Sequence, residues 1–156
     1  MELNMATDRD YELWVLLHQT SDIIARARDD ELRGFGVSEV QAAVLFVVKN
    51  AQVPVTPAEI SRWLFREPHT VSGLLNRMVK QGLIKKEKNL ERKNLIRVTL
   101  TKKGEEAYQR SEEQRGIQKI LSTLSQKERD NLRAHLGKLR SKGLKELGLK
   151  RQLPFP

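Results

Sequence analysis

Two blocks of residues carry most of the information about this fold: residues 70–84 read TVSGLLNRMVKQGLI, and residues 96–104 read IRVTLTKKG. The first block repeats an apolar residue at helical spacing, at Val71, Leu74, Leu75 and Met78. Gly82 follows, and it is suited to end a helix because it tolerates a left-handed backbone. In the second block apolar and polar residues alternate, which predicts a strand.

Capping signals mark the starts of other helices. Each pairs a Ser or Thr with a Glu or Gln three residues later: Ser38 with Gln41, Thr56 with Glu59, and Ser125 with Glu128. The helix after Ser38 is apolar on most sides, so we expect it to be central. Pro57 and Pro68 stand where the first residue of a helix is expected, since that position needs no backbone N–H. An amphipathic pattern also predicts a long helix over residues 8–33.

Residues 83–88 and 95–100 are predicted to form two strands with a charged turn between them. The helical pattern returns after the second strand, with interruptions at Ser111 and Gln114. We therefore expect a single, mainly α domain, residues 1–156, that carries a small β-hairpin.

Positive charge is concentrated in the middle of the chain. The sequence has 29 Lys and Arg and 20 Asp and Glu, so its formal net charge is +9. Residues 60–103 contain 12 of the basic residues and three of the acidic ones, which accounts for the whole excess. Such a local excess is typical of a surface that binds a polyanion, and nucleic acid is the first candidate.

The composition argues against several classes of protein. There is no cysteine, which excludes disulfides, thiolate zinc sites and thiol nucleophiles. The three histidines are too scattered for a metal site, and we expect no cofactor. The longest apolar run, residues 42–48, is too short to span a membrane. The sequence opens without a basic-then-apolar leader, so we expect a cytoplasmic protein.

A helix, a tight break, a second helix and a basic hairpin follow in the order of a winged helix-turn-helix, over about residues 55–101. In such a unit the second helix enters the major groove and the hairpin, or wing, lies along the DNA backbone. The residues of this helix off its apolar stripe are His69, Thr70, Ser72, Gly73, Asn76, Arg77 and Lys80. We expect them to contact DNA, with Arg92 and Lys93 contributing from the hairpin tip.

The two blocks together, TVSxLLxRMVxxGLI and VTLTxKG at this separation, resemble the MarR family of transcription regulators. The similarity in helix order extends over about residues 8–147. This resemblance implies a homodimer in which the helices over 8–33 and 125–147 intertwine with those of the partner copy. It also implies a sequence-specific, ligand-responsive repressor that binds a palindromic operator in double-stranded DNA.

Repressors of this family often release DNA when a small aromatic ligand enters a pocket between the dimer helices and the DNA-binding lobe. The candidates for lining such a pocket are Trp14, His18, Phe46, Arg62 and Trp63. The two tryptophans are more typical of core or interface anchors than of a cofactor platform.

The hairpin tip departs from the family pattern. The family's wing usually carries Asp-x-Arg, whose Arg reaches DNA. Here the nearest match is Glu91-Arg92-Lys93, with Asn94 where a gapless alignment would place the arginine. Arg92 is therefore the first candidate for the residue that reaches DNA, and Lys93 is the second.

Three other functions have to be distinguished from this one. A non-specific architectural nucleic-acid binder would rely on phosphate contacts and show little sequence preference. A protein-interaction module built on the winged domain would bind no DNA. An enzyme is disfavoured, because the sequence has no nucleophile motif, no Gly-rich phosphate loop and no suitably placed acid pair.

Overall fold

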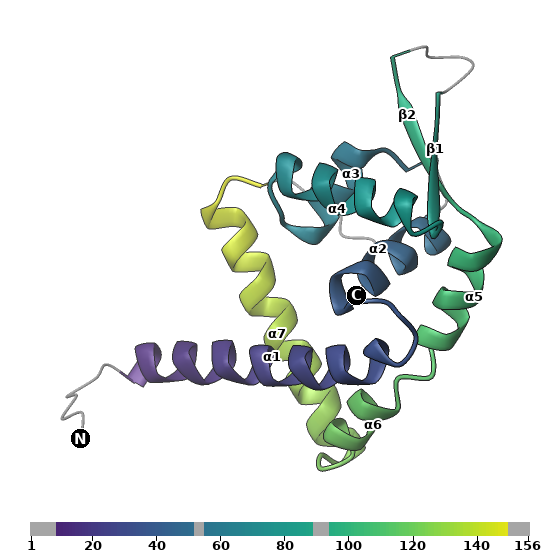
Figure 1. Ribbon diagram of the computed structural model, residues 1–156. Coiled ribbons are helices and arrows are strands. Elements are labelled where there is room, and N and C mark those ends of the chain that lie inside the picture. Colours follow the sequence, from purple (N-terminus) through teal and green to yellow (C-terminus); the bar gives the residue numbers. More distant parts are fainter. Residues whose placement is uncertain (1–8, 52–54, 89–93, 150–156) are drawn as a thin grey trace, which may run out of the picture.

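The computed structural model describes residues 9–51, 55–88 and 94–149. Within these ranges the elements are α1 (Arg9–Arg33), α2 (Glu39–Asn50), α3 (Pro57–Leu64), α4 (Pro68–Lys80), β1 (Ile84–Lys88), β2 (Ile96–Leu100), α5 (Lys102–Ser111), α6 (Arg115–Leu121) and α7 (Gln126–Glu146). Helices α2 to α5 and the hairpin form a compact lobe, from which α1 and α7 extend as two long arms (Figure 1). None of the helices in the described ranges is long and apolar enough to cross a membrane.

The helices begin where the capping signals predicted. The side chains of Ser38, Thr56 and Ser125 each accept a hydrogen bond from the backbone N–H three residues on, and the Glu or Gln at that position accepts from the backbone N–H of the cap. Pro57 and Pro68 are the first residues of α3 and α4. After α4, Gly82 adopts the left-handed conformation expected of it, with φ of 71°. Local sequence therefore sets most of the helix boundaries.

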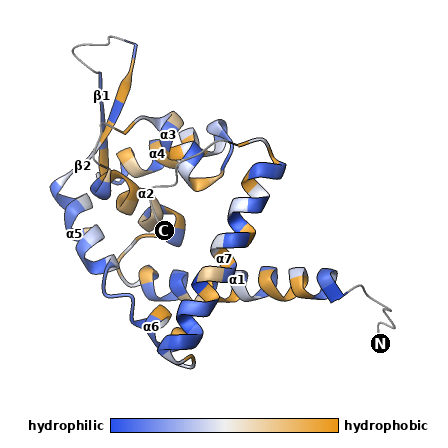
Figure 2. Cartoon of the chain, turned by 180° about the vertical axis from the view of Figure 1, so that it is seen from behind, coloured by the Kyte–Doolittle hydropathy of each residue, from blue (hydrophilic) through white to orange (hydrophobic). Residues whose placement is uncertain are grey.

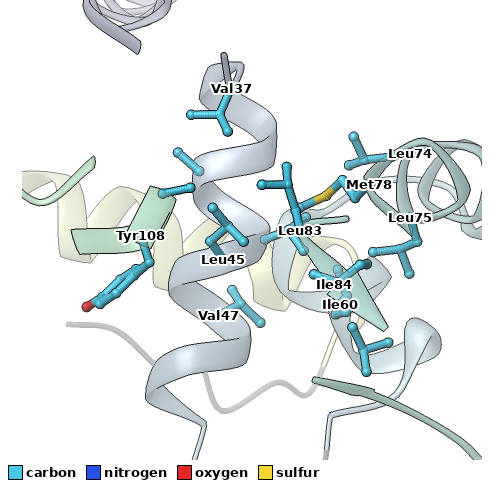
Figure 3. Close-up of a cluster of buried hydrophobic side chains, with 14 of the residues drawn as sticks. Val37, Leu45, Val47, Ile60, Leu74, Leu75, Met78, Leu83, Ile84 and Tyr108 are labelled. Atoms are coloured by element: carbon cyan, nitrogen blue, oxygen red, sulfur yellow. The ribbon is translucent and has the colours of Figure 1, made fainter. Parts of the chain in front are cut away.

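The core lies between α2 and the α3–α4 pair, with contributions from the hairpin and α5 (Figure 3). Its fully buried side chains include Leu45 and Val47 from α2, Ile60 from α3, Leu75 and Met78 from α4, and Ile84 from β1. Because α2 packs against α1, α3, α5 and β2, it is the central helix, as predicted from a sequence that is apolar on most sides. Burial of such side chains stabilises the lobe by about 25 cal/mol per Å² of apolar surface.

The hairpin is antiparallel, and its register pairs Ile84 with Leu100 at the base and Lys88 with Ile96 towards the tip. Val55, just before α3, adds an isolated bridge, because its carbonyl accepts from the N–H of Val98 at 2.8 Å. The base of the wing is thereby joined to the entrance of the helix-turn-helix.

The helical segment after the hairpin is divided in two. Residues 112–114 separate α5 from α6, and Gln114 has a positive φ of 42°. The break falls where Ser111 and Gln114 interrupt the apolar pattern. Arg28 of α1 is buried beside this break. Its guanidinium donates to the carbonyl of Ser111 and, at 2.8 Å, to the carboxylate of Glu31, so it ties α1 to the end of α5. Glu31 also accepts from the N–H of Gly116 at 3.2 Å.

The two arms leave wide apolar faces uncovered within one chain. Only Arg28 and Leu32 are buried in α1, and no residue of α7 is buried. The exposed apolar side chains on the arms include Leu13, Trp14, Leu16, Ile23, Leu132, Leu136 and Leu139. Hydrophobic segments recur along the whole length of α1 (Figure 2).

Candidate nucleic-acid interface

A tight turn fixes the angle between α3 and α4. Phe65 ends α3 in the left-handed conformation, with φ of 52°. The hydroxyl of Ser61 donates to the carbonyl of Arg66 at 2.6 Å, while the N–H of Arg66 donates to the carbonyl of Ser61 at 3.1 Å. Pro68 then starts α4 without needing a donor. The α3–α4 pair is thus held by hydrogen bonds within the turn as well as by the core.

Helix α4 has one buried and one exposed face. Its apolar stripe, Val71, Leu74, Leu75 and Met78, is buried as predicted. Six of the seven residues expected to contact DNA are exposed, namely His69, Thr70, Ser72, Asn76, Arg77 and Lys80, and Gly73 is half-buried. The exposed face therefore presents hydrogen-bonding and basic side chains along the whole helix, and no bulky side chain stands at Gly73.

Hydrogen bonds connect the C-terminal end of α4 to α2 and α5. Gln81, directly after α4, accepts at its side-chain carbonyl from Nε2 of Gln41 at 2.7 Å. Its backbone carbonyl accepts from Nζ of Lys103 at 2.8 Å. These bonds set the orientation of α4 relative to α2 and α5, so the exposed face is displayed by a rigid support.

The hairpin adds basic side chains beside α4. Lys85, Lys88 and Arg97 are exposed on its strands, and Nζ of Lys85 lies 2.9 Å from the carboxylate of Glu87. Arg92 and Lys93 lie outside the described residues, so their role at the tip stays a prediction.

Lys86 is a basic residue of this surface that was not predicted from the sequence. Nζ of Lys86 donates to Oδ1 of Asn76 at 2.7 Å, which links the wing directly to the exposed face of α4. The signal available in the sequence was the two-residue period of the strand. Lys86 shares its face with Ile84 and pairs in register with Val98, both buried.

In the described part of the chain, no group of three or more His, Asp or Glu side chains is placed to hold a metal ion. What the surface offers is an exposed helix face and a basic hairpin, an arrangement that can bind a nucleic-acid duplex.

Comparison with known proteins agrees with this geometry. The sequence profile of the MarR family matches residues 35–93, which include α2, α3, α4 and β1. The ligand-free structure of the organohalide-sensing transcriptional regulator RdhR is 29% identical, covers 92% of this chain and 86% of its own, and superposes with a TM-score of 0.82. Over residues 35–93 the chain therefore resembles the MarR family. Its fold is that of the winged-helix transcription regulators that it resembles.

Two further solved structures resemble this chain. RdhR bound to 2,4-dichlorophenol is 29% identical over 92% of this chain and 90% of its own, with a TM-score of 0.77. A mutant MarR from E. coli complexed with operator DNA is 23% identical over 85% of this chain and 99% of its own, also with a TM-score of 0.77. No curated protein sequence gives a significant match.

The structure places the five residues expected to line an effector pocket in different surroundings. Trp14 and His18 stack on α1, with ring centroids 5.6 Å apart. Phe46 lines a cavity of about 180 Å³ between α1, α2, α5 and α6, which includes none of the other four. Trp63 packs against the core from α3, and Arg62 precedes it on the exposed side of that helix. Their shared role as an effector site stays a prediction.

Proposed function

We propose that this protein is a homodimeric, sequence-specific DNA-binding repressor that binds a palindromic operator. The observation that carries the proposal is the exposed face of α4, where Asn76, Arg77 and Lys80 stand in a row opposite a fully buried stripe. An α-helix of this kind fits the major groove, where each base pair presents a distinct pattern of donors and acceptors. The hairpin beside it supplies cations for the phosphate backbone.

The dimer is supported by the two arms. Leu13 and Ile23 of α1 are 60% and 64% exposed, and Leu139 of α7 is 55% exposed, which is unusual for apolar side chains of a monomer. The charges of the arms are also complementary. Helix α1 contains six acidic and four basic residues, whereas α7 contains seven basic and three acidic ones. Packing of α1 from one copy against α7 of another would cover both apolar faces and bring opposite charges together.

Two-fold symmetry of the protein would be shared by its operator. We therefore expect two half-sites in inverted orientation, about one helical turn of DNA, roughly 34–36 Å, apart. Each copy of α4 would occupy one half-site.

The test begins with selection of bound duplexes from a random pool by the full chain. Affinity for the selected operator and for a scrambled duplex is then measured across a salt series. Asn76→Ala should erode discrimination by about 1–3 kcal/mol at a contacted base pair. Arg92→Ala should weaken binding to both duplexes alike and lower the salt slope by about one unit per subunit. Lys119→Ala, at an exposed lysine of α6, is the matched control.

The outcomes separate the alternatives. Tight binding without sequence preference would identify an architectural protein, and the absence of DNA binding would identify an interaction module. If Arg92→Ala lost the preference for operator over scrambled duplex while Asn76→Ala kept it, the wing and not α4 would read the sequence.

The proposed repressor would also release its operator on binding a small aromatic molecule. Support comes from RdhR, whose structure holds 2,4-dichlorophenol. The chain contains two tryptophans, Trp14 and Trp63, and both are among the candidate contacts. Titration with 2,4-dichlorophenol should quench their fluorescence and release operator together. Trp14→Phe and Trp63→Phe would show which indole reports binding of the ligand. Release of operator DNA without any change in fluorescence would mean that neither tryptophan lies in the ligand site.

A further inference from the structure

The hydrogen bond between Lys86 and Asn76 joins the wing to the exposed face of α4. Lys86 lies in the middle of β1, and its side chain is half-buried on the same side as its register partner Val98. From there Nζ reaches Oδ1 of Asn76 at 2.7 Å, a short distance typical of a charge-assisted bond. The neighbouring Lys85 lies on the opposite side of the strand and contacts Glu87 instead.

The chemistry of the two groups fixes which way the carboxamide faces. An ammonium group can only donate hydrogen bonds, so the atom that Asn76 turns towards Lys86 has to be its oxygen. Its NH2 group then remains for another partner. The ammonium group also retains N–H donors beyond the one given to Asn76. The Lys86–Asn76 pair therefore presents donors to a ligand above α4.

A donor-rich pair distinguishes between purines. In the major groove guanine presents two acceptors, N7 and O6, whereas adenine presents the acceptor N7 and the donor N6. An unconstrained asparagine suits adenine, because its oxygen accepts from N6 while its nitrogen donates to N7. With Lys86 donating to that oxygen, an adenine amino group would have to compete with an ammonium ion for the same acceptor. Guanine has no such conflict.

We propose that Lys86 is a specificity-determining residue, and that the Lys86–Asn76 pair selects guanine over adenine at the base pair facing Asn76. This inference rests on the proposed function, because it assumes that α4 reads base edges. It goes beyond that function because it makes Lys86, a residue of the wing, responsible for which purine Asn76 of α4 binds.

The test uses Lys86→Met, which keeps an aliphatic stem but removes the donor, and Lys85→Met as the matched control. Both variants lose one positive charge on the same strand, and only the first loses the bond to Asn76. After an operator has been selected with the wild-type protein, affinities are measured for duplexes that differ at single base pairs. The wild type should prefer guanine at one position per half-site by about tenfold. Lys86→Met should abolish or reverse that preference in favour of adenine, and Lys85→Met should preserve it.

Asn76→Ala provides the second arm of the experiment. In that background Lys86→Met should no longer change the base preference, because the residue through which it acts is absent. Uniform weakening by Lys86→Met and Lys85→Met, with guanine still preferred, would make Lys86 a phosphate contact and overturn the inference alone. Failure of the wild-type protein to select any sequence would overturn the proposed function, and the inference with it.

Discussion

Gly104 stands at a close contact where the backbone leaves no room for a side chain. A Cβ atom added there would lie 2.0 Å from the carbonyl oxygen of Leu83, because the start of α5 packs directly on the chain that leaves α4. Gly104→Ala should therefore destabilise the protein by about 1–3 kcal/mol through overpacking. Gly73→Ala is the control, since nothing lies within 4 Å of its added Cβ, and it should stabilise α4 by about 0.5–1 kcal/mol. Urea denaturation measures both changes, and equal effects would contradict the packing argument.

At the same scale, Glu31 should make the free energy of unfolding depend on pH in acid solution. Burial alone would raise the pKa of Glu31, but hydrogen bonds from Arg28 and from the N–H of Gly116 outweigh it and hold the pKa below its usual value. A lowered pKa in the folded state stabilises the protein above the ordinary Glu pKa of about 4.3, and this contribution is lost as the pH falls through the folded-state value.

Glu31→Gln should therefore cost stability at neutral pH, and the difference from wild type should shrink as the solution is acidified. Arg28→Met should weaken the same pH dependence, because it removes the main donor. The free energy of unfolding, measured in urea between neutral and acid pH, provides the comparison. A difference between wild type and Glu31→Gln that stays constant over that range would show that the carboxylate contributes nothing to acid sensitivity.

At the scale of elements, Thr101 is the joint between the wing and α5. Its hydroxyl oxygen accepts from the N–H of Gly104 at 3.0 Å and so caps α5, while the hydroxyl donates to the carbonyl of Gly82 at 2.5 Å. This explains physically why a Thr and a Gly stand three residues apart in the block after β2: one caps the helix, and the other permits its close approach.

Thr101→Val should cost about 0.5–2 kcal/mol, because it removes the cap while keeping the shape of the side chain. Thr99→Val is an isosteric control two residues away, where the buried hydroxyl has no hydrogen-bond partner among the described residues. Losing that hydroxyl should be neutral or stabilising, since an unsatisfied polar atom is replaced by an apolar one. Thermal unfolding of both variants tests the prediction. If Thr101→Val and Thr99→Val lost the same stability, the cap hydrogen bond of Thr101 would contribute nothing.

At the scale of the whole molecule, the arms should determine the oligomeric state. Leu139→Glu places a charge on the apolar face of α7, whereas Ser141→Glu places the same charge about 200° further around the helix. We expect the first variant to sediment as a folded monomer with weakened operator binding, and the second to sediment as a dimer like the wild type. A stable wild-type monomer at micromolar concentration would refute the proposed assembly.

The order of helices and strands could be predicted from the sequence because its signals are local. A capping Ser or Thr, a Pro at the first helical position and a Gly after the last turn act within three or four residues, so Thr56, Pro68 and Gly82 could be interpreted without a partner. The exposed face of α4 followed from its apolar stripe in the same way. The residue of the hairpin tip that reaches DNA, Arg92 or Lys93, stays a prediction.

Contacts between distant residues required the tertiary structure. Lys86 meets Asn76 only because the hairpin folds back beside α4, and Arg28 of α1 meets the carbonyl of Ser111 only across 83 positions of chain. The need for glycine at position 104 depends on where Leu83 lies. Periodicity shows which face of an element is buried, but it does not specify the neighbouring element or the atoms that come into reach. Those are set by how the whole chain packs.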